Sequence, residues 1–281
     1  MSGLLSSKLL IILLSLGLAA CVDLEDDDDE NPINSEGETV DDTSLALNGF
    51  WDGGLDQTDT LRVLIYNGDF YGLDGDKGFF GTVASPQDEE VDFTLTSYPF
   101  AHEDTGNNEF VADGLATSYT INGLLATTST IVGEFTANAT EFGSITLVND
   151  TTYANNSSLT SLVGKWTTTD LEMNITSRGN FLGFNTSETQ NCSFEGEFNI
   201  INSSNSLLSI TIDRRNCEDF NGETTGFAAI NGEGELEIYS RNGSSLLFMK
   251  FSPPAATGGT ETPAEGEEET PTDGEAEAPA E

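Results

Sequence analysis

Apolar and polar residues alternate with a period of two over much of this chain, which is typical of β-strands that bury one face. Residues 61–65 read Leu-Arg-Val-Leu-Ile, and residues 235–239 read Glu-Leu-Glu-Ile-Tyr. The segments 193–200, 207–213 and 246–251 have the same character. Beyond the amino-terminal segment, no stretch of about 12 residues has helical periodicity. The pattern therefore predicts an all-β protein.

Turn signals punctuate these segments. The dipeptides Asn67-Gly68 and Asn242-Gly243 are strong signals for two-residue β-hairpins, because both central residues of such turns adopt positive φ angles. Short strands separated by turns at intervals of roughly 8 to 12 residues are typical of antiparallel sandwiches and barrels.

The chain also repeats itself. Gly49-Phe50-Trp51 returns as Gly164-Lys165-Trp166. Three further echoes follow in the same order: residues 68–72 in 179–183, Phe80-Gly81 in Glu195-Gly196, and Ile121-Asn122-Gly123 in Ile230-Asn231-Gly232. We predict two tandem small antiparallel β-barrel or sandwich domains, at residues 45–150 and 159–252. Because a polar linker joins them, we expect few contacts between them and independent folding.

The amino terminus has the three parts of a secretory signal, which we place at residues 1–20. Lys8 precedes an apolar run, Leu9 to Leu18, that is about half as long as the ~20 residues of a membrane-spanning helix. Its end, Leu18-Ala19-Ala20-Cys21, resembles the lipobox of bacterial lipoproteins. The resemblance implies cleavage before Cys21, a diacylglycerol on its thiol and a fatty acid such as palmitate on the new amino group.

Two or more acyl chains hold a protein stably on a membrane. Val22 follows the cysteine, and in enterobacterial lipoproteins a residue other than Asp at this position permits passage to the outer membrane. We therefore expect a lipid-anchored protein of the bacterial cell envelope, at the outer membrane, on either its periplasmic or its surface face.

The charge of the chain is extreme, with 49 acidic and 9 basic residues and a net charge of -40. Residues 21–44 carry 11 acids and no base, and residues 253–281 carry 9 acids and no base. Neither segment has enough apolar residues to offset the entropy of ordering, so we predict a disordered acidic tether and a disordered acidic tail. Nucleic acids are bound through Lys and Arg, so this charge argues against them as partners.

Cys192 and Cys217 remain as an even pair in an oxidising compartment, which favours a disulfide. In a hairpin that turns near Ser204, Phe198 faces Thr211 and the two cysteines face each other. Directly opposed residues of antiparallel strands lie within disulfide reach. A redox or metal-binding pair is the alternative, but the sequence has neither a CxxC spacing nor a histidine nearby.

Signals for catalysis and metal binding are weak. His102 is the one histidine, and no pair among the many carboxylates stands out as an acid and base. Residues 74–78, Asp-Gly-Asp-Lys-Gly, resemble the start of a calcium loop. However, the fifth position is Gly and no Glu follows at position twelve. We interpret this segment as a turn, and we expect no enzyme, no catalytic residues, no metal site and no cofactor.

The second repeat resembles two known groups of β domains. Leu162-Val163-Gly164-Lys165-Trp166 is similar to the Gly-X-Trp start of lipocalin-like barrels. Together with Cys192, Gly196, Phe198, Cys217 and the strand at 246–248, it resembles META-type domains of envelope lipoproteins. This resemblance implies an all-β domain without known catalytic residues.

The leading functional hypothesis is a non-enzymatic envelope lipoprotein whose β domains bind an unknown envelope protein or a small ligand, or have a structural role. Two alternatives stay open. One is a carboxylate-dependent extracytoplasmic hydrolase, and the other is a calcium-dependent surface adhesin.

Overall fold

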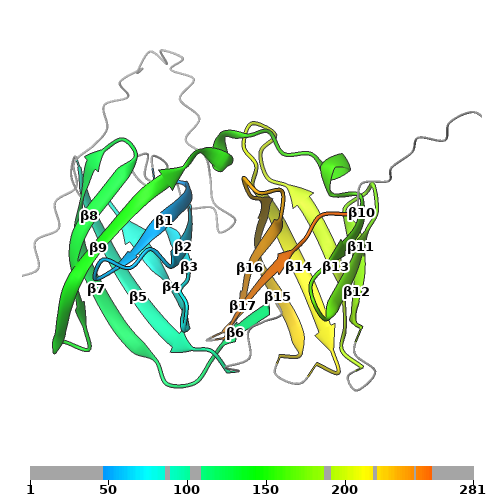
Figure 1. Ribbon diagram of the computed structural model, residues 1–281, viewed down its shortest axis with the longest axis horizontal. Helices are drawn as coiled ribbons and strands as arrows, with labels where there is room; N and C mark the ends of the chain where they lie inside the picture. Colours follow the sequence, from blue (N-terminus) through cyan, green and yellow to red (C-terminus); the bar gives the residue numbers. More distant parts are fainter. Residues whose placement is uncertain are drawn as a thin grey trace, which may run out of the picture. The chain divides into compact units, whose positions relative to one another are not determined.

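The computed structural model describes residues 47–85, 89–101, 109–186, 191–217, 220–243 and 245–254, and it confirms an all-β protein (Figure 1). The first group of elements is β1 (Gly49–Leu55), β2 (Leu61–Tyr66), β3 (Asp69–Leu73), β4 (Lys77–Ala84), β5 (Glu90–Pro99), β6 (Glu109–Ala112), β7 (Thr117–Thr127), β8 (Thr130–Ala137) and β9 (Glu141–Asp150). Two 3-10 turns follow, η1 (Thr151–Ala154) and η2 (Leu159–Leu162). The remaining strands are β10 (Gly164–Thr167), β11 (Leu171–Ile175), β12 (Asn180–Asn185), β13 (Ser193–Ile200), β14 (Leu208–Arg215), β15 (Gly222–Ile230), β16 (Leu236–Asn242) and β17 (Ser245–Phe251).

The first β domain is a closed antiparallel barrel in the order β1-β2-β3-β4-β5-β7-β8-β9, which we call the first barrel. It closes where β1 pairs with β9, from Phe50 opposite Asp150 to Leu55 opposite Ile145. Side chains fill its interior, and those buried there include Trp51 and Phe70. The barrel is therefore a packed core and not an open ligand cavity.

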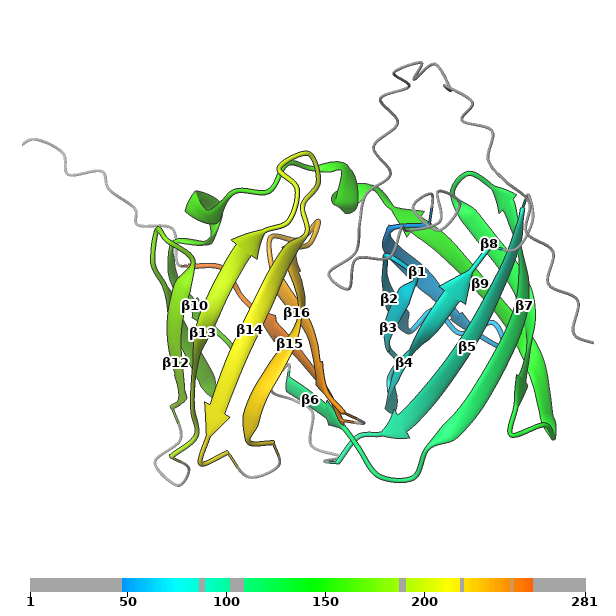
Figure 2. The ribbon, with the colours of Figure 1, turned by 180° about the vertical axis from the view of Figure 1, so that it is seen from behind.

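The second β domain is a curled nine-stranded sheet in the order β10-β11-β12-β13-β14-β15-β16-β17-β6, which we call the second sheet (Figure 2). Trp166, Phe194 and Phe251 are buried on its concave side. Along the described chain, β10 meets β17 at a single bridge, Thr167 opposite Ser252, with N···O distances of 3.2 and 2.8 Å. The second sheet is thus a curled half-barrel, and we call the place where β10 and β17 meet its seam.

Three of the four sequence echoes occupy matching places in the two domains. The Nε1 atoms of Trp51 and Trp166 donate to the carbonyls of Leu47 and Leu162, at 3.0 and 2.7 Å. Each tryptophan is thereby fixed in the core by a bond to the residue four positions earlier. The fourth echo does not match, because Gly123 lies within β7 whereas Gly232 lies in the turn after β15.

The echo of Phe80-Gly81 in Glu195-Gly196 has a steric cause. A Cβ atom on Gly81 would lie 2.0 Å from the carbonyl oxygen of Thr94, and one on Gly196 would lie 1.9 Å from that of Thr211. The neighbouring strand therefore passes too close for any side chain. The same close approach at the same place in both domains supports the duplication inferred from sequence.

The predicted turn at Asn67-Gly68 is confirmed, with φ angles of 50° and 83° between β2 and β3. The predicted hairpin between β16 and β17 also forms, but its turn begins one residue later than predicted. Asn242 is still paired, opposite Ser245, and Gly243 has a φ of 57°. The predicted register of β13 and β14 is wrong by one residue, because Phe198 faces Ile210 and not Thr211. Asn216 at the end of β14 adopts a φ of 58°, an extra kinked residue that returns Cys217 to the position opposite Cys192.

The expectation of few contacts between the two β domains is wrong. The described parts of both belong to one compact unit, and a hydrophobic cluster contains residues from each, among them Phe50 and Leu64 of the first barrel and Tyr239 and Phe248 of the second sheet. Leu64 and Tyr239 stand on the outer faces of their strands, so both faces of β2 and β16 are buried. The predicted limits of the domains, 45–150 and 159–252, stay predictions.

Several predictions concern residues outside the described ranges. These are the signal peptide at 1–20, Cys21, the acidic tether at 21–44, His102 and the acidic tail from residue 255 onward. Among the described residues, no helix has the length and apolar character needed to cross a membrane.

Candidate functional site

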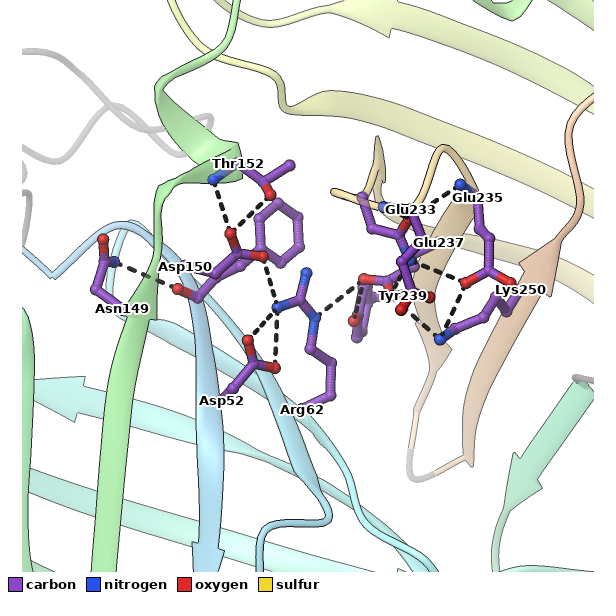
Figure 3. A network of polar contacts seen from close by, with 12 residues as sticks. Asp52, Arg62, Asn149, Asp150, Thr152, Glu233, Glu235, Glu237, Tyr239 and Lys250 are labelled. Carbon is purple, nitrogen blue, oxygen red and sulfur yellow. Dashed lines mark hydrogen bonds and ion pairs between the residues drawn. The ribbon is translucent and has the colours of Figure 1, made fainter.

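The most extensive polar network of the described chain surrounds the guanidinium of Arg62 on β2 (Figure 3). Its Nη1 lies 3.0 Å from Oδ2 of Asp52 and 2.9 Å from Oδ2 of Asp150, and its Nε lies 3.1 Å from Oε2 of Glu237. The carbon at the centre of the guanidinium sits 4.8 Å from the centre of the Phe50 ring. One cation thus joins three carboxylates and an aromatic face.

The strand register places the first two carboxylates. Asp52 on β1 lies directly opposite Arg62 on β2. Asp150 ends β9, and its Oδ1 accepts hydrogen bonds from the backbone N–H and the hydroxyl of Thr152, at 2.9 and 2.7 Å. Asp150 therefore caps the turn η1 with one oxygen and binds Arg62 with the other.

The third carboxylate belongs to the second sheet. Glu237 on β16 accepts a hydrogen bond of 2.9 Å from the hydroxyl of Tyr239 and one of 3.0 Å from Nδ2 of Asn231. Lys250 on β17 lies 3.6 Å from Glu237 and 3.4 Å from Glu235. Because Glu237 is only 5% exposed, these partners compensate a buried charge.

The electrostatics of the site favour an ionised Asp150 and a neutral Tyr239. Burial alone would lower the pKa of Arg62, but Tyr239, Glu237 and Asp52 outweigh it and raise that pKa above the ordinary value. Burial acts to raise the pKa of Asp150, yet hydrogen bonds from Thr152 and Arg62 bring it below 3.8. Burial, with Glu237 nearby, raises the pKa of Tyr239 well above 10.0.

An open pocket of about 410 Å³ adjoins this network. Its lining contains five carboxylates and two cationic side chains. The carboxylates are Asp52, Asp59, Asp150, Glu233 and Glu237, and the cations are Arg62 and Lys250. The pocket is large enough for a small ligand, and its charge favours a ligand that carries positive charge.

The sequence-predicted site residues fall elsewhere. Cys192 and Cys217 form the predicted disulfide, with their Cα atoms 4.2 Å apart. Asp74 is part of a turn, in which its Oδ1 accepts from the backbone N–H of Gly75 at 2.7 Å. Among the described residues, no group of three or more His, Cys, Asp or Glu is arranged to hold a metal ion.

Sequence reasoning missed Arg62 and Glu237 as site residues, because both look like solvent-facing positions of alternating strands. The signal that could have identified Arg62 is the scarcity of basic residues. The chain has only 9 basic residues, and a base within an apolar strand of so acidic a protein is a candidate for a buried ion pair.

No protein-family model matches this chain, and no curated protein matches its sequence.

Proposed function

We propose that this is a non-enzymatic, lipid-anchored protein of the bacterial envelope, whose pocket beside Arg62 binds a small polar ligand with a cationic group. The observation that carries the ligand is the pocket lined by five carboxylates and two cations. The observation that carries the anchor is the sequence Leu18-Ala19-Ala20-Cys21 after a short apolar run.

The directions of the pKa shifts favour binding over catalysis. A general acid at neutral pH needs a carboxyl group whose pKa is raised towards 7. The pKa values of Asp150 and Glu235 are instead lowered, although burial opposes this, by hydrogen bonds and by the nearby cations. Ionised carboxylates of this kind attract cations and do not donate protons.

Ligand binding can be tested on residues 22–281, made without lipid. Polyamines, amino sugars and basic dipeptides are screened by thermal shift, and hits are measured by calorimetry. We expect saturable binding that weakens in high salt and falls at least tenfold in Asp59→Asn and Glu233→Gln. Glu141→Gln, an exposed acid on β9 outside the pocket, is the matched control. Equal affinity in all four proteins would reject the site.

The anchor is tested separately in cells. With Cys21→Ser we expect no labelling by a fatty-acid analogue and accumulation of the uncleaved precursor. A mutant labelled as strongly as the unaltered chain would disprove the lipoprotein proposal and leave the ligand proposal standing.

A carboxylate-dependent hydrolase is the second candidate, and the same acid-lined pocket favours it. In that case Asp59→Asn or Glu233→Gln would abolish hydrolysis of glycoside substrates without lowering the melting temperature. A calcium-dependent adhesin would instead show a higher melting temperature in millimolar calcium, and that increase would disappear with a chelator.

A further inference from the structure

The seam of the second sheet, where β10 and β17 meet at one bridge, is covered along the β17 edge by a strand from the other domain. In the first barrel, six residue pairs join the first and last strands. In the second sheet, the corresponding strands share the bridge between Thr167 and Ser252. The edge of β17 from Leu246 to Met249 pairs instead with β6. Figures 1 and 2 both show β6 beside the second sheet.

The strand β6 is an insertion. It lies between β5 and β7, whereas the matching strands of the second domain, β14 and β15, follow each other directly. On one edge, the carbonyl of Val111 accepts from the N–H of Ala101 at 2.7 Å, and the N–H of Asp113 donates to the carbonyl of Pro99 at 3.1 Å. Since backbone groups alternate between the two edges, those of Phe110 and Ala112 point to β17.

The side chains of β6 that face the second sheet are Glu109 and Val111. Val111 is 8% exposed and belongs to the core of the second sheet. Glu109 forms an ion pair with Nη2 of Arg214, a residue of β14 that is 4% exposed. An acidic residue and an apolar residue two positions later therefore enter the seam from the same face of the strand.

Arg214 is only partly satisfied by this arrangement. Its Nε and Nη1 atoms are buried and have no hydrogen-bond partner. Its Nη2 contacts Glu109 and lies 3.6 Å from Sγ of Cys192. Buried donors without acceptors cost free energy, and a guanidinium binds a carboxylate best through two parallel hydrogen bonds. The seam thus offers donors that its present occupant leaves unused.

We propose that this seam is an acceptor site for an extended peptide segment of a partner protein, and that β6 is its built-in, replaceable occupant. The segment would add to β17 as a strand. It would carry a carboxylate that binds Arg214 with both oxygens and, two residues later, a β-branched apolar side chain in the place of Val111. Main-chain hydrogen bonds would supply affinity, and these two side chains would supply specificity.

The first experiment empties the seam. Val111→Asp in residues 22–281 places a charge in the core and expels β6, while Leu115→Asp, at a side chain 89% exposed in the same insertion, is the matched control. A labelled peptide with the sequence of residues 107–114 is titrated into each protein. We expect the Val111→Asp protein to bind it at least tenfold more tightly than either the control or the unaltered chain.

The peptide's own variants test the chemistry. Replacing its glutamate by glutamine should weaken binding to the Val111→Asp protein severalfold, and this preference should vanish when Arg214→Gln is added. A Val111→Asp protein that keeps its β-sheet circular dichroism but binds no peptide overturns the proposal.

A second measurement uses the unaltered chain and does not depend on that variant folding. Excess peptide should speed hydrogen exchange at the amides of Phe110 and Ala112, while the amides of β17 stay protected. If the protection of both amides is unchanged at the highest peptide concentration, the proposal is also overturned. Dimers that form with rising protein concentration and ignore the peptide would assign the seam to β6 of a second copy, against the proposal.

Discussion

Arg62 and Glu237 are 175 residues apart in the chain, yet Nε of the arginine lies 3.1 Å from Oε2 of the glutamate. The arginine belongs to the first barrel and the glutamate to the second sheet, so this ion pair joins the two β domains. It is surrounded by aromatic side chains, with the rings of Phe50 and Tyr239 6.1 Å apart. The two side chains are 15% and 6% exposed, so the pair is largely buried at the edge of the pocket, and each partner depends on the other.

Removing the arginine should destabilise the protein strongly. Arg62→Met deletes the cation that neutralises Asp150 and Glu237, and loss of one partner from a buried pair costs about 3 kcal/mol. Urea unfolding of the variant measures this loss. Arg215→Met, at a side chain 60% exposed, is the control and should leave the midpoint unchanged. Restoration by the second change Glu237→Gln would show that the unpaired carboxylate causes the loss.

Stability should fall at both extremes of pH. The folded pKa of Asp150 lies below 3.8, because bonds from Thr152 and Arg62 outweigh burial. Its contribution is present above about pH 4 and is lost as the pH falls through the folded value. Burial raises the folded pKa of Tyr239 well above 10.0, so its contribution is lost as the pH rises past 10. Unfolding from pH 2 to 12 measures both.

Single variants separate these two limbs of the pH profile. Asp150→Asn should flatten the acid limb and leave the alkaline limb in place. Tyr239→Phe should have the opposite effect, weakened by Tyr71, whose pKa burial raises to about 12. A profile that neither variant alters would contradict the assignment.

Loss of the disulfide should weaken the second sheet locally. Cys192 and Cys217 are 25 residues apart, and a loop of that length corresponds to about 3 kcal/mol in the chain-entropy model. The double serine variant should lose hydrogen-exchange protection in β13 and β14 before β1 and β2 are affected. Dithiothreitol should lower the urea midpoint of the unaltered chain and have no effect on the variant.

The two glycines at which neighbouring strands approach closely should not tolerate an added methyl group. Gly81→Ala and Gly196→Ala place a Cβ within 2.0 Å of a carbonyl oxygen of the next strand, and overpacking of this kind costs about 1–3 kcal/mol. Gly75→Ala is the control, because nothing lies within 4 Å of its added carbon. Thermal melts of the three variants compare them, and equal melting temperatures would refute the steric argument.

The two domains should differ when separated. The strands β1 to β5 and β7 to β9 form a barrel that closes on itself, so the fragment 45–150 should melt cooperatively, although it exposes Phe50 and Leu64, which are buried in the whole protein. Residues 159–252 lack β6 and expose the edge of β17 together with Phe248. We expect that fragment to associate or aggregate, as measured by light scattering, and a stable monomer would show that β6 is dispensable.

The alternation of residues was enough to predict the strands but not what covers their outer faces. Residues 235–239 read as a half-buried strand with Glu237 in solvent, whereas Glu237 is 5% exposed. A period of two identifies two faces, and it carries no information on whether a second layer packs against the outer one. Burial of both faces depends on the other domain, which lies far away in sequence.

The disulfide was predictable and its register was not. Two cysteines flanking a hairpin within range of each other suffice for the bond. The pairs of the hairpin lie one residue from the predicted register, and the left-handed conformation of Asn216, with a φ of 58°, brings Cys217 back opposite Cys192. Such a kink involves a single residue. Because Asn is also common in ordinary turns, its presence does not predict a kink at this position.

The strand β6 escaped the sequence analysis because four residues are too few for a periodic signal. Its identity as a strand depends on the open edge of β17 and on the apolar core that Val111 joins, and neither exists until the second sheet has formed. A short strand of this kind forms only where another strand offers it an unpaired edge.

The position of β6 in the chain has a consequence for synthesis. Domains generally fold as the chain emerges, with the amino-terminal one first. The first barrel can close once β9 has been made, and it then presents β6 with one edge unpaired. Its partner β17 is the last strand of the described chain and so emerges after all the others in that part. Until then, the finished barrel carries a template edge onto which the growing second sheet can dock.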